Sequence, residues 1–291
     1  MNAVSDMRRK SLLTMLQAAP LVAVLLVFFG VPMMTVIVVS FCDYEHARIL
    51  PTFTFDNYAD LLRSDATLRL YLGSIKFTLF AWALTLAIGF TVAYFLVFHV
   101  EGVILQMSLF LVCTIPFWTS NIIRMISWIP FLGREGLFNH ALADLGVIHR
   151  PLDFLLFSDF SVILAYVHLY TLFMVVPIFN AMARIDKRLL EAARDAGASR
   201  WQTVRQVVIP LSRTGIALGS IFVVALTMGD FFVVKVMSGG QSSSIVAAMY
   251  NEIAGLQFPP AAASAVVLTA VVMAFVAAIL RVVDVRRELI G

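Results

Sequence analysis

Six long apolar runs dominate this sequence, at residues 20–41, 74–98, 104–130, 160–182, 214–237 and 261–283. An α-helix rising ~1.5 Å per residue needs roughly 20 apolar residues to cross the ~30 Å hydrocarbon core of a bilayer. Every run is that long, and none shows the strict alternation of a barrel strand. The sequence therefore predicts an all-α polytopic membrane protein with six transmembrane helices.

Composition agrees with this interpretation. Of the 291 residues 61% are hydrophobic and only 13% are charged, whereas soluble proteins average roughly 45–50% and 25%. A cytosolic globular enzyme, a disordered chain and a disulfide-rich secreted module are excluded. The net charge of +3 is too small to indicate nucleic acid, and the two cysteines, Cys42 and Cys113, have no metal-site spacing. We expect no metal site and no cofactor bound by this chain.

The basic residues predict which side of the membrane each loop faces. Six spans place both termini on one side, and 13 of the 21 Lys and Arg residues fall there or in the loop between the fourth and fifth runs: Arg8, Arg9, Lys10, Arg184, Lys187, Arg188, Arg194, Arg200, Arg205, Arg213, Arg281, Arg286 and Arg287. Loops rich in Lys and Arg stay inside. We predict a cytoplasmic tail at 1–18, a transmembrane domain at 19–283 and a cytoplasmic tail at 284–291.

Two outer loops contain apolar stretches too short to span. The first holds Phe53, Phe55, Tyr58 and Leu61, which predict a short helix on the membrane surface. The third holds an apolar stretch at 245–256, which suits a re-entrant or interfacial helix.

The inner loop 184–210 predicts two short helices joined by a turn. Asp186 suits the N-cap of the first, Gly197 its C-terminus, and Ser199 the N-cap of the second. Pro210 is expected to end the second helix and begin the next span. The apolar sides are expected at Leu189, Leu190, Ala193 and Ala196 in the first helix, and at Trp201, Val204, Val207 and Val208 in the second.

Two alternatives remain for this loop. A compact helix with small residues at Ala192, Ala193 and Ala196 can fit a groove of a soluble partner. Alternatively, the loop folds back on its own inner helices.

The spacing in this loop resembles the EAA loop of ABC-importer permeases. That pattern has Glu-Ala-Ala, three residues, Gly, nine residues and Ile-x-Leu-Pro; here Glu191-Ala192-Ala193 and Gly197 match, and Val207 and Ile209 precede Pro210 at the aliphatic positions. The segments 116–124, 132–139 and 229–233 resemble the spermidine/putrescine-type branch. Together the resemblance covers most of the chain from residue 74 onward.

The resemblance implies a type I importer (MetI-like) permease fold with a coupling loop at 184–210 that docks into a cleft of the ATP-binding subunit. It implies two ATPase subunits that bind ATP and Mg, a second homologous permease (a heterodimer favoured over a homodimer), an extracytoplasmic solute-binding protein and a bacterial inner membrane. The chain itself lacks a Walker A pattern, Gly-x-x-x-x-Gly-Lys-Ser/Thr. The candidate coupling residues are Glu191, Ala192, Ala193, Asp195, Gly197, Ala198, Arg200, Trp201, Arg205 and Pro210.

Ionisable residues within the spans are candidates for the translocation path, because burial of charge in a bilayer is costly. Arg124, His168 and Asp230 all fall in the outer half of their spans. We hypothesise that Arg124 and Asp230 pair; the alternative is that each reaches separately to the outer headgroups. For His168 an interhelical hydrogen bond is favoured over ligand contact. The candidate path residues are Trp118, Asn121, Arg124, His168 and Asp230.

The leading interpretation is a non-catalytic permease subunit importing a small charged organic solute, either polyamine-like or of the opine, phosphonate or amine type. An integral membrane enzyme needs clustered His or carboxylates, and the five histidines are scattered. An ion-coupled secondary carrier needs acidic residues in mid-membrane and inverted repeats. Asp230 is the one candidate acid, and the sequence shows no repeat. The sequence leaves the substrate open.

Overall fold

The computed structural model describes residues 17–45 and 48–282. Within these ranges, five helices are long and apolar enough to cross a membrane, and a bent helix pair makes a sixth candidate span. The five are Gln17–Ser40, Asp65–Phe98, Asp159–Met182, Arg200–Met228 and Phe258–Arg281. The predicted multi-span helical fold is confirmed. Residues 1–16 of the predicted N-terminal tail (1–18) and all of the predicted C-terminal tail (284–291), with their basic residues, lie outside the described residues.

The chain divides into two compact units, one of Met1–Ser64 with Met249–Val267 and one of Asp65–Ala248 with Leu268–Gly291. In the first unit the opening helix contains a π-helical turn, η1 (Leu26–Gly30), followed by α2 (Val31–Ser40). The unit also holds the end of α14 (Ile245–Ala254) and the beginning of α15 (Phe258–Val282). The helix predicted at 245–256 is therefore present as α14.

The first outer loop corrects one prediction. Its aromatic residues do not all lie on a surface helix, because β1 (Cys42–Glu45) and β2 (Arg48–Phe53) form an antiparallel hairpin before α3 (Asp56–Arg63). Phe41 stacks on Phe53 with ring centroids 5.0 Å apart, and Asn57 Nδ2 donates to the carbonyls of Ser40 (3.1 Å) and Cys42 (2.8 Å). These contacts fold the loop back on the end of the first span.

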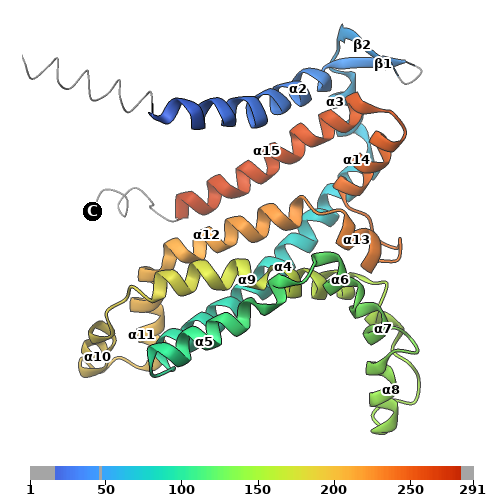
Figure 1. Ribbon diagram of the computed structural model, residues 1–291. Helices are drawn as coiled ribbons and strands as arrows, with labels where there is room; N and C mark the ends of the chain where they lie inside the picture. The colour runs from blue at the N-terminus through green and yellow to red at the C-terminus, as the bar shows by residue number, and fades with distance from the viewer. Residues whose placement is uncertain (1–16, 46–47, 283–291) are drawn as a thin grey trace, which may run out of the picture. The chain divides into compact units, whose positions relative to one another are not determined.

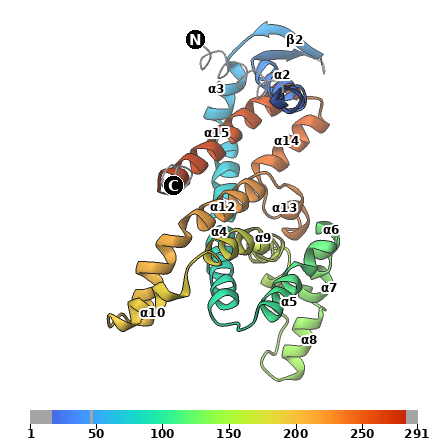
Figure 2. The ribbon, with the colours of Figure 1, turned by 60° about the vertical axis from the view of Figure 1, so that its left-hand side comes forward.

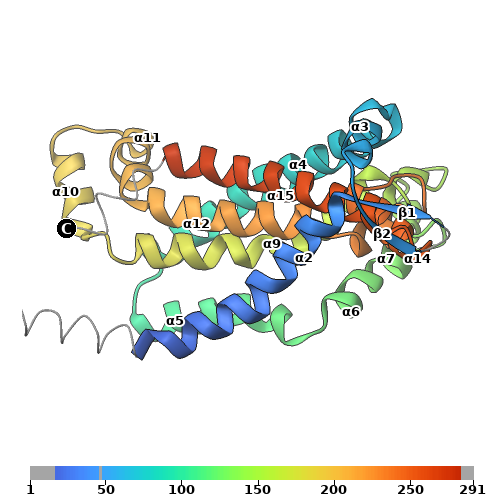
Figure 3. The same ribbon diagram turned by 90° about the horizontal axis from the view of Figure 1, so that it is seen from above.

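The second unit is built around three long helices, α4 (Asp65–Phe98), α9 (Asp159–Met182) and α12 (Ile209–Met228), which lie side by side (Figures 1 and 3). Glycines permit this close packing. A Cβ added at Gly89 of α4 would stand 2.8 Å from Met174 Cγ of α9, and one at Gly219 of α12 would stand 2.7 Å from Met174 Sδ. Met174 therefore fills the space that the two glycines leave.

The third predicted span, 104–130, is not one straight helix. It consists of α5 (Val103–Thr114), the 3₁₀ turn η2 (Ile115–Trp118), α6 (Asn121–Ile126) and α7 (Trp128–Leu132), followed by α8 (Leu137–Asp144), with a 90° bend at the break (Figure 1). Pro116 lies in the 3₁₀ turn, and Thr119 has an extended backbone. Pro116 lacks the N–H that would continue α-helical hydrogen bonding, which favours the 3₁₀ turn at this position. A short turn, η3 (Asp153–Leu155), precedes α9.

The fifth predicted span, 214–237, is also corrected. The helix begins at Arg200, runs through α11 (Arg200–Thr203), a π-helical turn η4 (Val204–Val208) and α12, and ends at Met228; α13 (Phe232–Met237) is separate. The prediction that Pro210 ends the second helix of the loop is therefore wrong. It lies near the start of α12, directly after a widened turn, where its missing N–H is tolerated.

The glycine packing predicts the effect of adding a methyl group at Gly215. A Cβ there would stand 2.6 Å from Ala181 Cβ and 3.0 Å from Ile178 Cα, and would collide with the carbonyl of Pro177. We expect Gly215→Ala to lower stability in detergent by about 1–3 kcal/mol, the usual cost of overpacking, despite the better helix propensity of alanine.

The measurement is thermal unfolding of the purified protein. Gly30→Ala is the matched control, because a Cβ at Gly30 meets only Leu26 Cδ2 at 3.7 Å, an ordinary contact. Equal melting temperatures for the two variants would contradict the packing argument.

Candidate functional site

The predicted helix–turn–helix between the fourth and fifth spans is present, and we call residues 184–210 the coupling segment. Asp186 caps α10 (Lys187–Asp195) by accepting from the Arg188 amide at 2.9 Å. Gly197 has φ +82°, which favours glycine. Ser199 and Gln202 form a reciprocal capping box at the start of α11. These local signals confirm the caps expected from the sequence. The segment lies at one end of α9 and α12 (Figures 1 and 2).

Exposure within the coupling segment differs from the expected apolar sides in three places. Leu190 and Val208 are buried, but Leu189 is 49% exposed, Trp201 is 69% exposed and Ala196 is also exposed. An indole left this open on a helix of a folded chain is typical of a contact with another protein. Most of the candidate coupling residues are also exposed: Glu191, Ala192, Asp195, Gly197, Arg200, Trp201, Arg205 and Pro210, with Ala193 and Ala198 half-buried.

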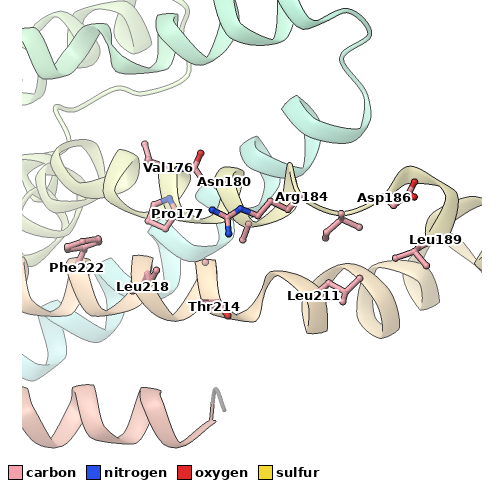
Figure 4. Close-up of a pocket in the computed structure, with 13 residues that line it drawn as sticks. Val176, Pro177, Asn180, Arg184, Asp186, Leu189, Leu211, Thr214, Leu218 and Phe222 are labelled. Carbon is pink, nitrogen blue, oxygen red and sulfur yellow. The ribbon is translucent and has the colours of Figure 1, made fainter. Parts of the chain in front are cut away.

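A groove lies between α9 and α12 and ends at the coupling segment. Its cavity measures about 760 Å³, with Val176, Pro177, Asn180 and Arg184 lining it from the α9 side and Leu211, Thr214, Leu218 and Phe222 from α12 (Figure 4). Apolar side chains form most of the wall, while polar side chains gather toward the coupling segment. No signal in the sequence indicates this groove, because it depends on which faces of two helices meet.

Aromatic side chains continue the groove toward the break in the third span. A second cavity of about 260 Å³ shares Val176, Pro177 and Phe222 with the first and is also lined by Phe117 and Phe173. The Phe173 ring lies 5.1 Å from Phe117, 6.3 Å from Phe222 and 6.2 Å from Tyr170, centroid to centroid. We call Phe117, Tyr170, Phe173 and Phe222 the aromatic ladder.

The outer end of the ladder meets Asp230. Tyr170 Oη donates to Asp230 Oδ2 at 2.7 Å, and the Val233 amide donates to Asp230 Oδ1 at 2.9 Å. Asp230 thus caps the break between α12 and α13. The carboxylate is half-buried and has both oxygens bound.

Arg124 does not form the hypothesised pair with Asp230: none of the ion pairs found in residues 17–45 and 48–282 joins them. Arg124 is 6% exposed, donates to Asn121 Oδ1, and lies over the Phe117 ring with Cζ 5.1 Å from its centroid. Its Nε and Nη1 are buried without a hydrogen-bond partner among the described residues. Ring stacking and the asparagine therefore take the place of the expected carboxylate.

Of the remaining path candidates, His168 is held by a hydrogen bond and Trp118 is exposed. His168 accepts from Trp128 Nε1 at 2.9 Å through Nδ1, which confirms the interhelical hydrogen bond expected for it. Trp118, at the break of the third span, is 81% exposed. The structure thus brings Asn121 and Arg124 together on α6, while His168 is bound to Trp128 and Asp230 to Tyr170.

Comparison with known proteins identifies the family. No family model matches the chain. It is 35% identical over 249 residues to the spermidine/putrescine transport system permease PotB of Salmonella typhimurium strain SL1344, covering 85% of each protein. PotB of Escherichia coli K12 is 34% identical, with 85% of this chain and 89% of that protein covered. The chain belongs to the ABC-importer permeases.

More distant comparisons agree. The inner membrane ABC transporter permease YdcU of Escherichia coli K12 is 27% identical, covering 77% of this chain and 79% of that one. A chain from a crystal structure of a bacterial ABC transporter that imports alginate superposes with a TM-score of 0.70 at 18% identity, covering 97% of this chain and 98% of that one. The fold is that of a MetI-like permease. The protein is a multi-pass, non-catalytic transport subunit of an ATP-driven importer.

The contact between Tyr170 and Asp230 predicts a loss of stability on Tyr170→Phe. The variant keeps the ring stacking and removes only the hydroxyl, leaving a partly buried carboxylate with one donor fewer. We expect a loss of about 1–3 kcal/mol, because hydrogen bonds to charged groups contribute ~1.5–3 kcal/mol. The measurement is the melting temperature in detergent. The same substitution is then made in the Asp230→Asn background. If Tyr170→Phe costs equal stability in the wild-type protein and in the Asp230→Asn protein, the two side chains are not coupled.

Proposed function

We propose that the chain imports a small organic amine of the polyamine type. The observation that carries this proposal is its 35% identity, over 85% of its length, to a spermidine/putrescine permease. The aromatic ladder supports it, because ammonium groups bind aromatic faces with ~0.5–2 kcal/mol each. Asp230 at the outer end of the ladder adds a negative charge where a cationic solute would arrive.

The proposed path follows the features of the second unit. The solute enters near Asp230 and Trp118, passes the aromatic ladder, and leaves through the groove past Asn180 and Thr214. Arg124, bonded to Asn121 and lying over the Phe117 ring, fixes α6 relative to the preceding 3₁₀ turn within the bent third span, and His168 fixes α9 to Trp128. Their proposed role is to position the ladder.

The coupling segment is proposed to dock into a cleft of the ATP-binding subunit. Its exposed Glu191, Arg200 and Trp201 supply charge and an aromatic anchor. The assembly contains two such subunits, and these bind ATP and Mg. Their closure on ATP moves the coupling segment, which rocks the bundle and alternates access to the path.

A single chain lines only one side of the proposed path, so we include a second, homologous permease and favour a heterodimer. Delivery of the solute is assigned to an extracytoplasmic binding protein. One structurally similar ABC transporter chain comes from a complex with an alginate pentasaccharide-bound periplasmic protein, at 17% identity and a TM-score of 0.70 over 95% of both chains. The proposed location is the bacterial inner membrane.

Reversing the charge at Glu191 tests the docking. We expect Glu191→Arg to abolish co-purification with the ATPase and to reduce solute uptake at least tenfold, since coupling between sites typically has a ~5–150-fold effect. Glu101→Arg is the control, because Glu101 is also exposed and lies between the second and third apolar runs, where the predicted topology likewise places the chain inside. An intact complex containing Glu191→Arg would contradict the docking role.

Truncating one side chain of the aromatic ladder tests the path. Phe222→Ala is expected to reduce uptake of radiolabelled spermidine or putrescine, with a loss between twofold and about thirtyfold that corresponds to ~0.5–2 kcal/mol. ATPase docking should be unaffected. Phe80→Ala is the control, because Phe80 lies on α4 with 54% of its surface exposed and lines none of these cavities. Equal losses in both variants would argue against the ladder as the path.

A further inference from the structure

A single widened turn joins the coupling segment to the fifth span. Residues Val204–Val208 form a π-helical turn in which the Ile209 amide donates to the carbonyl of Val204, five residues back. The helix is α-helical on both sides, in α11 and α12. A π turn within an α-helix accommodates one extra residue.

The pattern of burial depends on this extra residue. Thr203 is 3% exposed, and Val208 and Ser212 are fully buried, so consecutive buried positions are five and then four residues apart. At ~100° per residue, two positions five apart on an unbroken α-helix point about 140° away from each other. The widened turn brings Thr203 onto the face of Val208, and Trp201 is thereby left 69% exposed.

Pro210 opposes closure of the turn without being its whole cause. In a regular α-helix its ring would meet the carbonyl of Gln206, four residues back. The other π turn in the described ranges, η1 (Leu26–Gly30), likewise stands just before Pro32. However, α9 passes through Pro177 as an α-helix. A proline alone therefore does not widen a helix, and the need to bury Thr203 together with Val208 decides the geometry here.

We propose that the π turn sets the rotational register of the coupling segment relative to the fifth span, so that Arg200, Trp201 and Arg205 face the ATP-binding subunit. The proposal rests on the proposed docking for its functional consequence. The turn itself is a positioning element: it touches neither the solute nor the nucleotide. Closing it without removing a residue would turn Trp201 by about 100°.

A deletion and an insertion at the same position test the register. Deleting Gln206, an exposed residue of the turn, leaves Thr203 four residues before Val208, which is the α-helical spacing. We expect the Gln206-deleted chain to co-purify with the ATPase and to retain uptake within about twofold of the parent. Inserting an alanine after Gln206 adds a second extra residue, and uptake should fall at least ~tenfold.

In an ordinary α-helix both the deletion and the insertion would change the register and reduce uptake. Tolerance of the deletion together with loss on insertion is therefore specific to a helix that contains one extra residue. If deletion and insertion reduce uptake equally, or if both are tolerated, the register proposal is wrong.

Cysteine accessibility separates the register from the docking. With Cys42 and Cys113 replaced by Ser, and in inverted vesicles that contain this permease without the ATPase, Thr203→Cys should be protected from a membrane-impermeant maleimide, and Trp201→Cys should react. We expect this pattern to persist after deletion of Gln206, whereas insertion should remove the protection at position 203. Unchanged protection after insertion would overturn the register. If Glu191→Arg has no effect on assembly, the docking fails while the accessibility pattern still tests the turn.

Discussion

Close packing of α4, α9 and α12 is the constraint on which the second unit depends. In a bilayer, helices gain little from the hydrophobic effect when they associate, so contact between small residues must hold them together. Gly215 and Gly219 form a G-x-x-x-G pair on α12, and Gly215 lies against Pro177 and Ala181 while Gly219 lies against Met174. The groove and the base of the coupling segment are built on α9 and α12, which also carry Tyr170, Phe173 and Phe222 of the aromatic ladder.

Local signals in the sequence predicted a large part of this structure. Length and hydropathy located the spans, and the caps at Asp186, Gly197 and Ser199 appeared as expected, because each depends on neighbouring residues alone. The EAA spacing pointed to the family. The β1–β2 hairpin, the exposed Trp201 and the unbroken helix through Pro210 were mispredicted. Each depends on packing partners or backbone adjustments that periodicity does not encode.

The hypothesised pair of Arg124 and Asp230 shows that similar depth in the membrane and opposite charge are not enough to predict an ion pair. Both residues were placed in the outer half of the membrane, yet Asp230 is held by Tyr170 and Val233, and Arg124 by Asn121 and the Phe117 ring. Aromatic rings and amides can thus take the place of a countercharge. The groove was unpredictable for a related reason: its walls belong to helices whose facing sides are set by the glycine contacts.

The unbroken helix from Arg200 to Met228 explains how the coupling segment and the path are linked mechanically. Its 29 residues extend for about 43 Å. One end carries the exposed Trp201, and farther along lie Phe222 of the ladder and Thr227, which is hydrogen-bonded to Thr78 of α4 at 3.1 Å. Had Pro210 ended a helix, a flexible joint would separate these ends and absorb displacement. A helix that continues past the proline transmits rotation, so the register of one turn at its base determines how docking outside the bilayer acts on residues inside it.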